Sequence, residues 1–321
     1  MIKYFSDVEG YDLFKRYCPH GNFIPQDLYN DWLEDIYCYG VSEYDNPVSL
    51  DEAKDLYVSL ITLGIRVEGR QWIPANDFKN MLEIIQPMSY ILSQFAPEYF
   101  FPYLFLCRIF ELNQIADFFD IDLPGIPKKT DYEGRCMYYW GLCETFYEFR
   151  KKNGLSSTEL CAFLYDFAFN ILEKERGDIP QPAQAWFIGG LMYPEDLVLE
   201  MKFWQSNQET KRGDILVHYE TLPVSAISCV EIALTNGVVD PLFRFYSNTY
   251  IGNRVDIPRI ALKELQADEY FSKHPLVRKN FQGVNGYPMS NEDYLELLRM
   301  IKAKGFDINI LPKLYAPTLP K

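Results

Sequence analysis

The residue best suited to ligand chemistry in this sequence is Trp204, which stands immediately before eight polar residues, 205–212. A tryptophan of a protein core is normally surrounded in sequence by apolar residues, so one beside a polar segment is placed to form the wall of an open pocket. Stacking a nucleic-acid base on an aromatic ring contributes roughly 1–3 kcal/mol, which is comparable to the cost of taking that base out of a duplex. The alternative is that Trp204 only covers one end of a fold.

The sequence contains no comparable arrangement for catalysis. Glu195, Asp196 and Glu200, with Lys202, have the residue types of a magnesium site. They lie within eight positions on what we expect to be one amphipathic helix over 194–203, so a solvated helix face is the favoured interpretation. Cys18 and His20 lack a third group to orient them. Nucleotide-binding, zinc-protease, esterase and kinase motifs are absent. We therefore expect a protein that is not an enzyme and has no cofactor.

The cysteines and histidines do not predict a metal centre. The seven cysteines (residues 18, 38, 107, 136, 143, 161 and 229) form no CxxC pair, and the three histidines are widely spaced. Most of the cysteines lie in apolar stretches, which is typical of reduced, buried thiols. The first ten residues lack an apolar signal core, and the longest apolar run, around 100–110, is too short to cross a bilayer. These features predict a cytoplasmic protein that does not contact membranes.

Charge divides the chain into two unequal parts. The 321 residues carry a formal net charge of −14. Residues 1–180 hold 29 acidic and 16 basic side chains, a net charge of −13, whereas residues 181–321 hold 16 and 15, a net charge of −1. An acidic surface repels nucleic acid over a Debye length of about 8–10 Å, so only the second part is suited to a polyanion.

The first part has the periodicity of helices. Ser49 with Glu52, and Ser156 with Glu159, have the spacing of helix-capping boxes. Apolar residues recur at helical spacing to about Leu63 and over 77–95, 103–119 and 134–152, with a further helix after Ser156 to about Ile171. We expect residues 1–178 to form an acidic, all-α helical domain.

The pattern changes after the proline- and charge-rich segment 175–184. Short runs typical of strands follow, at 185–188, 215–219, 224–234, 243–251 and 257–262, separated by Gly, Asn, Asp and Pro. A second helix is expected over 291–304, capped by Ser290. The strand spacing predicts a small β-barrel with flanking helices over 179–321, which makes the chain an α+β protein.

From Trp186 to about Leu298 the sequence resembles the EVE domain of the PUA-like superfamily, which is related to the YTH readers. The similarity rests on the order of several loose motifs. They are the opening strand AWFIGG, Trp204 before a polar segment, KRGD leading into ILVHY, the PVSAI turn, DPLF, and IPRIALKEL. Together they cover roughly 115 of the 321 residues. The helical part resembles no family that we identify.

The resemblance implies a PUA-like barrel that holds a flipped or modified base in an aromatic pocket without changing it chemically. Trp204 falls where those readers have their first cage tryptophan. The pocket residues expected on this basis are Trp186, Gly190, Trp204, Ser206, Asn207, Tyr219, Phe243 and Phe245. The alternatives are that Phe243 and Phe245 belong to the barrel core, and that Ser206 and Asn207 are ordinary loop residues.

Contacts to phosphate would come from cations around the pocket. The candidates are Lys211, Arg212, Arg244, Arg254, Lys273, Arg278 and Lys279. Dispersed cations are also typical of a solvated surface. The prediction of phosphate contacts therefore holds only if the fold brings these residues close to one another. The predicted partner is DNA or RNA, and the acidic helical domain is expected to serve as an adaptor that contacts a protein. The competing hypothesis is a protein-interaction or scaffold module that binds no nucleic acid.

Overall fold

The computed structural model describes residues 34, 41, 44–67, 70–105, 108–175, 177–191, 201–242 and 245–314. The chain divides into two compact units. One consists of Met1–Gly177 with Asp240–Phe245, and the other of Asp178–Val239 with Tyr246–Lys321. We call them the helical unit and the sheet unit. The chain passes from one to the other next to residue 178, where the sequence predicts a boundary, but the assignment of Asp240–Phe245 to the helical unit was not predicted.

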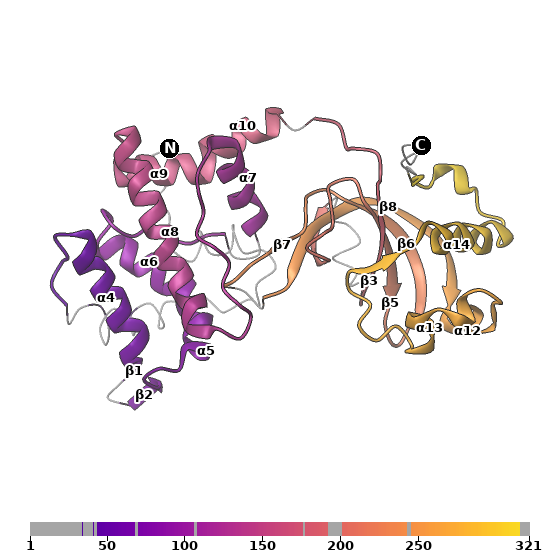
Figure 1. The fold of residues 1–321 in the computed structure, drawn as a ribbon, viewed down its shortest axis with the longest axis horizontal. Helices are drawn as coiled ribbons and strands as arrows, with labels where there is room; N and C mark the ends of the chain where they lie inside the picture. The colour runs from indigo at the N-terminus through magenta and orange to yellow at the C-terminus, as the bar shows by residue number, and fades with distance from the viewer. Residues whose placement is uncertain are drawn as a thin grey trace, which may run out of the picture. The chain divides into compact units, whose positions relative to one another are not determined.

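The helical unit is built mainly from helices (Figure 1). In chain order it contains α4 (Leu50–Leu63), β1 (Ile65–Val67), β2 (Arg70–Ile73), α5 (Phe78–Met81), η2 (Leu82–Ile84), α6 (Ile85–Phe95), α7 (Ile109–Phe119), α8 (Tyr132–Asn153), α9 (Ser157–Ala162), the π-helical segment η3 (Phe163–Phe167) and α10 (Ala168–Glu175). The antiparallel pair β1–β2 is an addition to the expected all-α arrangement.

Local signals explain where these helices begin and end. The Ser49 side chain accepts a hydrogen bond from the Glu52 N–H, and Ser156 and Glu159 form the complete capping box that their spacing predicts. Gly154 ends α8 in the left-handed conformation that glycine adopts without strain. The core combines aliphatic side chains with aromatic rings, and α8 supplies the buried Tyr139 and Trp140.

The segment Asp240–Phe245 is held in the helical unit by Arg135 of α8. The Arg135 Nε donates to the Pro241 carbonyl oxygen at 2.7 Å, and the guanidinium lies 5.1 Å from the centroid of the Phe245 ring. Arg135 and Leu242 are 6% and 5% exposed. Burial lowers the pKa of Arg135, although Tyr132, Cys136 and Asp240 act in the opposite direction.

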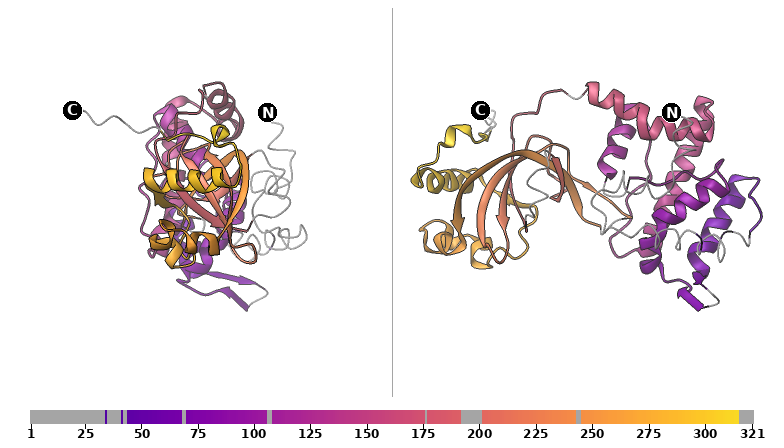
Figure 2. Two further views of the ribbon diagram at one scale, coloured as in Figure 1. Left: turned by 90° about the vertical axis from the view of Figure 1, so that its right-hand side faces the viewer. Right: turned by 180° about the vertical axis from the view of Figure 1, so that it is seen from behind.

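The sheet unit contains a curled mixed sheet of seven strands with flanking helices (Figures 1 and 2). Its strands are β3 (Ala185–Gly190), β4 (Met201–Gln205), β5 (Ile215–Glu220), β6 (Ala226–Ala233), β7 (Val238–Val239), β8 (Ser247–Ala261) and β9 (Tyr287–Met289). The strand order is β4-β8-β6-β5-β3-β9, with β7 paired to β8. Strands β3 and β5 are parallel, and the other pairs are antiparallel. The helices and turns are α12 (Leu262–Ala267), η4 (Phe271–Lys273), α13 (Pro275–Arg278), α14 (Asn291–Ala303) and η5 (Ile308–Ile310).

Two sequence predictions differ from these strands. The expected helix over 194–203 is wrong where the structure describes it, because Met201–Gln205 is strand β4; Glu195, Asp196 and Glu200 lie outside the described residues. The two strands expected at 243–251 and 257–262 are parts of one long strand, β8. In both cases the conformation depends on pairing with neighbouring strands. The local spacing of apolar residues does not reveal this pairing.

The sheet has two differently occupied faces. Phe187, Val217 and Val230 point to the face that packs against residues of the flanking helices, such as Leu276 and Leu297. The opposite face holds a smaller cluster made of Trp186, Ile188, Leu216, Ala233 and Ile251. Alternation of side chains along each strand separates the two sets. Among the helices of the described residues, none is long and apolar enough to cross a membrane.

Candidate functional site

Trp204 lies on the face of the smaller cluster. It is in the middle of β4, where it pairs with Thr249 of β8, and it is partly buried against the cluster. Its indole covers Gly190, because a Cβ built at that glycine would lie 2.5 Å from the indole Cζ2. The ring centroids of Trp204 and His218 are 4.7 Å apart, with the planes inclined at 61°. Trp186, Gly190 and Trp204, three of the predicted pocket residues, therefore lie on one face.

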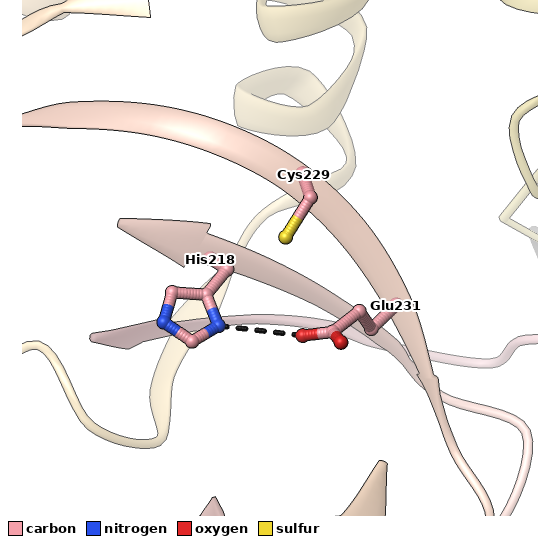
Figure 3. Close-up of side chains that lie close together, drawn as sticks. All are labelled: His218, Cys229 and Glu231. Carbon is pink, nitrogen blue, oxygen red and sulfur yellow. Dashed lines mark hydrogen bonds and ion pairs between the residues drawn. The ribbon is translucent and has the colours of Figure 1, made fainter. Parts of the chain in front are cut away.

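A buried polar cluster lies beside Trp204 on the same face. The Lys202 Nζ is 2.7 Å from the Glu231 Oε1, and the His218 Nδ1 is 3.3 Å from the Glu231 Oε2 (Figure 3). The Lys202, His218 and Glu231 side chains are 4%, 0% and 1% exposed. A carboxylate buried to this extent requires both partners, since an unpaired charge in such a place would cost several kcal/mol.

An irregularity of the sheet positions this cluster. The register of β6 against β8 shifts between Ile227 and Cys229, and that of β5 against β6 shifts between His218 and Tyr219. The extra residue in β6 turns Cys229 and Glu231 toward the face of His218, as Figure 3 shows, while Ile227 and Val230 remain on the helix-covered face. Lys202 reaches the cluster from β4.

The electrostatic environment keeps Glu231 ionised. Burial acts to raise the pKa of the Glu231 carboxyl, but the hydrogen bond from His218 and the charge and hydrogen bond of Lys202 outweigh it, so the pKa is lowered. Burial raises the pKa of the Cys229 thiol to about 12, and Glu231 adds to this effect. Burial acts to lower the pKa of Arg254, but attraction to Cys229, Asp256 and Glu231 raises it overall.

Several buried polar atoms near this cluster have no hydrogen-bond partner among the residues that the structure describes. They include the His218 Nε2, the Ser228 Oγ and the Arg254 Nη1. Buried polar groups in folded proteins nearly always have a partner, either protein or an ordered molecule. An ordered water molecule beside these atoms would supply such a partner.

The donor set His218, Cys229 and Glu231 has the composition of a zinc site, and its candidate ligand atoms lie within 4.8 Å of one another. The surroundings fit a metal ion poorly. The Lys202 ammonium lies 2.7 Å from the Glu231 carboxylate and already neutralises it. We interpret the cluster as a buried ion pair that orients His218.

A loop that contains Asn285 and Gly286 lies against the end of β3 and the segment after Trp204. The Asn285 Oδ1 accepts a hydrogen bond from the Gly189 N–H at 2.8 Å, and its Nδ2 donates to the Gln205 Oε1 at 3.2 Å. The Asn207 Nδ2 donates to the Gly286 carbonyl oxygen at 3.0 Å, and its Oδ1 accepts from the Glu209 N–H at 2.9 Å. The Asn207 side chain thus fastens the segment after Trp204 to the loop.

The remaining predicted pocket residues are placed differently. Tyr219 belongs to the helix-covered face, where its ring stacks on Phe281 at 3.9 Å with nearly parallel planes, so it does not face Trp204. Ser206 is 6% exposed and its hydroxyl donates to the Asn207 carbonyl oxygen. Phe245 belongs to the helical unit. Phe243 lies outside the described residues. Binding by any of these side chains remains a prediction.

The cations expected to contact phosphate do not form one group. Lys211 and Arg212 follow Trp204 in the same segment, and the Arg212 Nη1 donates to the Asp178 carbonyl oxygen at 3.2 Å. The Arg254 Nε donates to the Asp256 Oδ1 at 2.7 Å. Lys273, Arg278 and Lys279 are exposed near η4 and α13. Arg244 lies outside the described residues.

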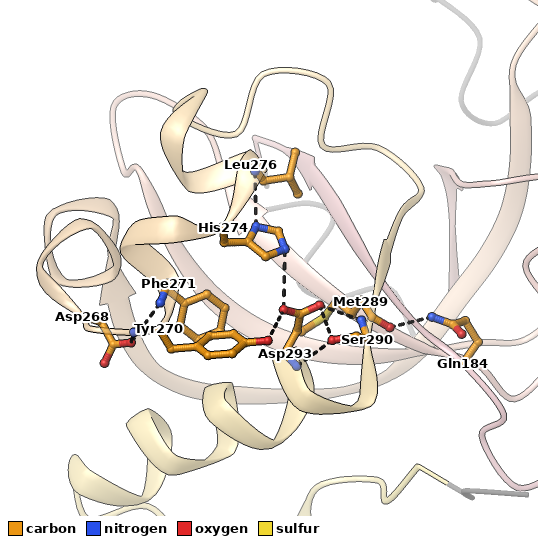
Figure 4. Close-up of polar contacts among 9 residues, drawn as sticks. All are labelled: Gln184, Asp268, Tyr270, Phe271, His274, Leu276, Met289, Ser290 and Asp293. Carbon is orange, nitrogen blue, oxygen red and sulfur yellow. Dashed lines mark hydrogen bonds and ion pairs between the residues drawn. The ribbon is translucent and has the colours of Figure 1, made fainter.

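A groove with a volume of about 670 Å³ lies elsewhere on the sheet unit, lined by Tyr270, His274, Tyr287 and Asp293 among others. The Asp293 Oδ1 accepts from the Tyr270 hydroxyl at 2.8 Å, and its Oδ2 accepts from the Ser290 N–H at 2.7 Å (Figure 4). The His274 Nδ1 accepts from the Leu276 N–H at 3.2 Å. These polar atoms have partners within the chain.

Sequence reasoning missed His218 and Glu231 as site residues, and considered Lys202 only as part of a helix face. A signal was present, because a histidine in ILVHYE and a glutamate in CVEIAL interrupt otherwise apolar strands. A charged side chain in such a strand is normally paired. The sequence does not show which side chain it is paired with.

No protein-family model matches the sequence, and no match appears among curated proteins. Two solved structures are similar to part of the chain. The NMR structure of Rpa0253 from Rhodopseudomonas palustris has a TM-score of 0.33 and 12% identity, covering 38% of this chain and 94% of its own. The crystal structure of Atu2648 from Agrobacterium tumefaciens has a TM-score of 0.35 and 17% identity, covering 42% of this chain and 100% of its own. These are distant likenesses and do not assign a family.

Proposed function

We propose that the sheet unit is a non-catalytic reader that binds a flipped or modified nucleic-acid base against Trp204. The observation that supports this proposal is that the partly buried indole of Trp204 lies over Gly190 and beside the ring of His218. An aromatic face of this kind can stack against a base.

The hydrogen-bonding role of His218 follows from its partner. Because an ionised carboxylate only accepts hydrogen bonds, a neutral His218 beside Glu231 carries its proton on Nδ1. Its Nε2 is then an acceptor, and the His218 side chain, which is 0% exposed, would have to become accessible before an N–H donor of a base could reach it. Lys202 supports this arrangement by holding Glu231 ionised.

Contacts to the sugar-phosphate backbone fit the segment that follows Trp204. Lys211 is exposed and Arg212 is half-buried, and both come within eight residues of the indole in sequence. Such cations would position a strand without reading its sequence. The near-neutral charge of residues 181–321 permits this contact, whereas the acidic helical unit would repel the same strand.

The test is a titration of the full chain with fluorescein-labelled oligonucleotides at low salt, with and without a methylated base. Trp204→Ala is expected to weaken binding by about 5-fold to 150-fold, since stacking contributes roughly 1–3 kcal/mol. Leu295→Ala is the matched control, because Leu295 is 56% exposed on α14 of the same unit. Absence of binding to every oligonucleotide, or equal binding by Trp204→Ala, would overturn the proposal. A metal-dependent cleavage assay is expected to show no cleavage.

A second candidate function, a protein-interaction module without nucleic-acid binding, is favoured by the net charge of −14. The titration separates the two functions. If the protein is a protein-interaction module, no oligonucleotide binds at low salt.

A further inference from the structure

The helical unit exposes a continuous row of phenylalanine rings. Neighbouring ring centroids are separated by 5.0 Å for Phe118–Phe119, 4.9 Å for Phe119–Phe163, 5.0 Å for Phe149–Phe163 and 6.3 Å for Phe163–Phe167. Phe118 and Phe167, at the two ends of the longest path, are 49% and 51% exposed. We call these five residues the phenylalanine row.

Three elements build the row. Phe118 and Phe119 end α7, Phe149 is in the last turns of α8, and Phe163 and Phe167 are the first and last residues of the π-helical segment η3. A π-helical turn widens the helix by one residue, and such turns are frequent at functional sites. Phe163 contacts rings from both α7 and α8. Phe118 and Phe167 are exposed and the other three rings are half-buried. Apolar side chains that are connected in this way, rather than scattered singly, are typical of an interaction site.

The charges next to the row are mostly acidic. Asp117 and Asp120 flank Phe118 and Phe119 and are exposed, Glu148 precedes Phe149 and is exposed, and Asp166 precedes Phe167. The nearby cations are Arg150, which is buried and paired with Glu98, Lys152, which is exposed, and Lys151, whose Nζ lies over the Tyr147 ring. Residues 1–180 carry a net charge of −13, from 29 acidic and 16 basic side chains.

This combination determines the kind of partner. Nucleic acid and anionic membranes would be repelled by the acidic residues, and a second copy of the chain would bring the same acidic rim against itself. A segment with an apolar stripe and lysines or arginines beside it satisfies both the rings and the charges. We propose that the phenylalanine row docks a basic amphipathic segment of a partner protein. This inference does not depend on the function proposed for Trp204.

The test measures fluorescence anisotropy of a labelled amphipathic peptide of leucine and lysine, about 14 residues long, with the full chain. The matched peptide replaces each lysine with glutamate. The lysine peptide is expected to bind and the glutamate peptide is not, and added salt should weaken binding because the charges are exposed. Phe118→Ser combined with Phe167→Ser is expected to weaken binding at least about tenfold.

The control is Ile126→Ser, which removes an apolar side chain of the same unit that is 51% exposed and outside the row. Equal affinity of the double phenylalanine variant and the unaltered chain would overturn the proposal, as would equal weakening by Ile126→Ser. Sedimentation supplies a second measurement. If the unaltered chain forms dimers that the phenylalanine variant does not, a second copy occupies the row and the proposal is wrong.

Discussion

The Cζ2 atom of Trp204 lies where a side chain at Gly190 would have to be, since a Cβ built on Gly190 comes within 2.5 Å of it. Gly190 is needed here for space rather than for backbone conformation, because its φ is not in the left-handed region. The close approach fixes the indole against the end of β3. It makes Gly190 as necessary to the candidate site as the indole itself.

Gly190→Ala is expected to displace Trp204 and to lower the free energy of unfolding by about 1–3 kcal/mol, the usual effect of overfilling a packed region. The measurement is urea denaturation followed by circular dichroism. Gly125→Ala is the control, because no atom lies within 4 Å of a Cβ built there. Adding Trp204→Ala should remove most of the effect of Gly190→Ala, and full additivity of the two changes would contradict the assigned contact.

Glu231→Gln is expected to lower the free energy of unfolding by about 3–5 kcal/mol, since it leaves the Lys202 ammonium buried without a counter-charge. Combining it with Lys202→Met should restore much of the loss. Glu144→Gln is the control, because it breaks an exposed ion pair with Lys54. The Lys54 and Glu144 side chains are 45% and 43% exposed, and the free energy of unfolding should change by less than about 0.5 kcal/mol. A loss from Glu231→Gln as small as that from Glu144→Gln would show that the buried pair is not formed.

The Cys229 thiol is expected to resist alkylation in the folded protein. Burial raises its pKa to about 12, and the residue is 0% exposed, so little thiolate is available to react. Mass spectrometry after iodoacetamide treatment at about pH 8 should show modification of Cys229 only after denaturation, with a rate difference on the order of a thousandfold. Rapid labelling of Cys229 in the native protein would contradict its placement in the sheet.

Stability is expected to fall as the pH decreases through the range in which a free histidine protonates, about 6.5 and below. Burial lowers the pKa of His274 in the folded state, and the opposing effect of Asp293 is smaller. The unfolded chain therefore binds a proton more readily than the folded chain, so the contribution of His274 is complete above that pH and decreases below it. His274→Asn keeps a cap for α13 and should flatten the pH dependence in urea titrations. An unchanged slope would show that His274 is not responsible.

Much of the fold could be predicted from local signals. Capping residues such as Ser156 and Ser290 fix helix starts within a residue, and the apolar run at 185–188 identifies β3. The strand Met201–Gln205 could not be predicted in this way. Lys202 and Trp204 alternate with Phe203, but this pattern indicates a strand only once the segment pairs with β8. The cluster around Glu231 depends on a β-bulge and on pairing between strands distant in sequence. Trp204 was selected from sequence because its polar neighbours are adjacent along the chain, and its part in binding stays a prediction.

The assignment of Asp240–Phe245 to the helical unit has a consequence for how the protein can be divided. A cut after Gly177 would leave each fragment incomplete, since the helical fragment would lack the six-residue segment that Arg135 holds and the other fragment would carry the buried Leu242 without its surroundings. Genetic truncation at that point is therefore a poor way to obtain either half. Thermal melting of the intact chain should be coupled between the halves, because β7 and β8 are covalently continuous with a stretch that melts with the helices.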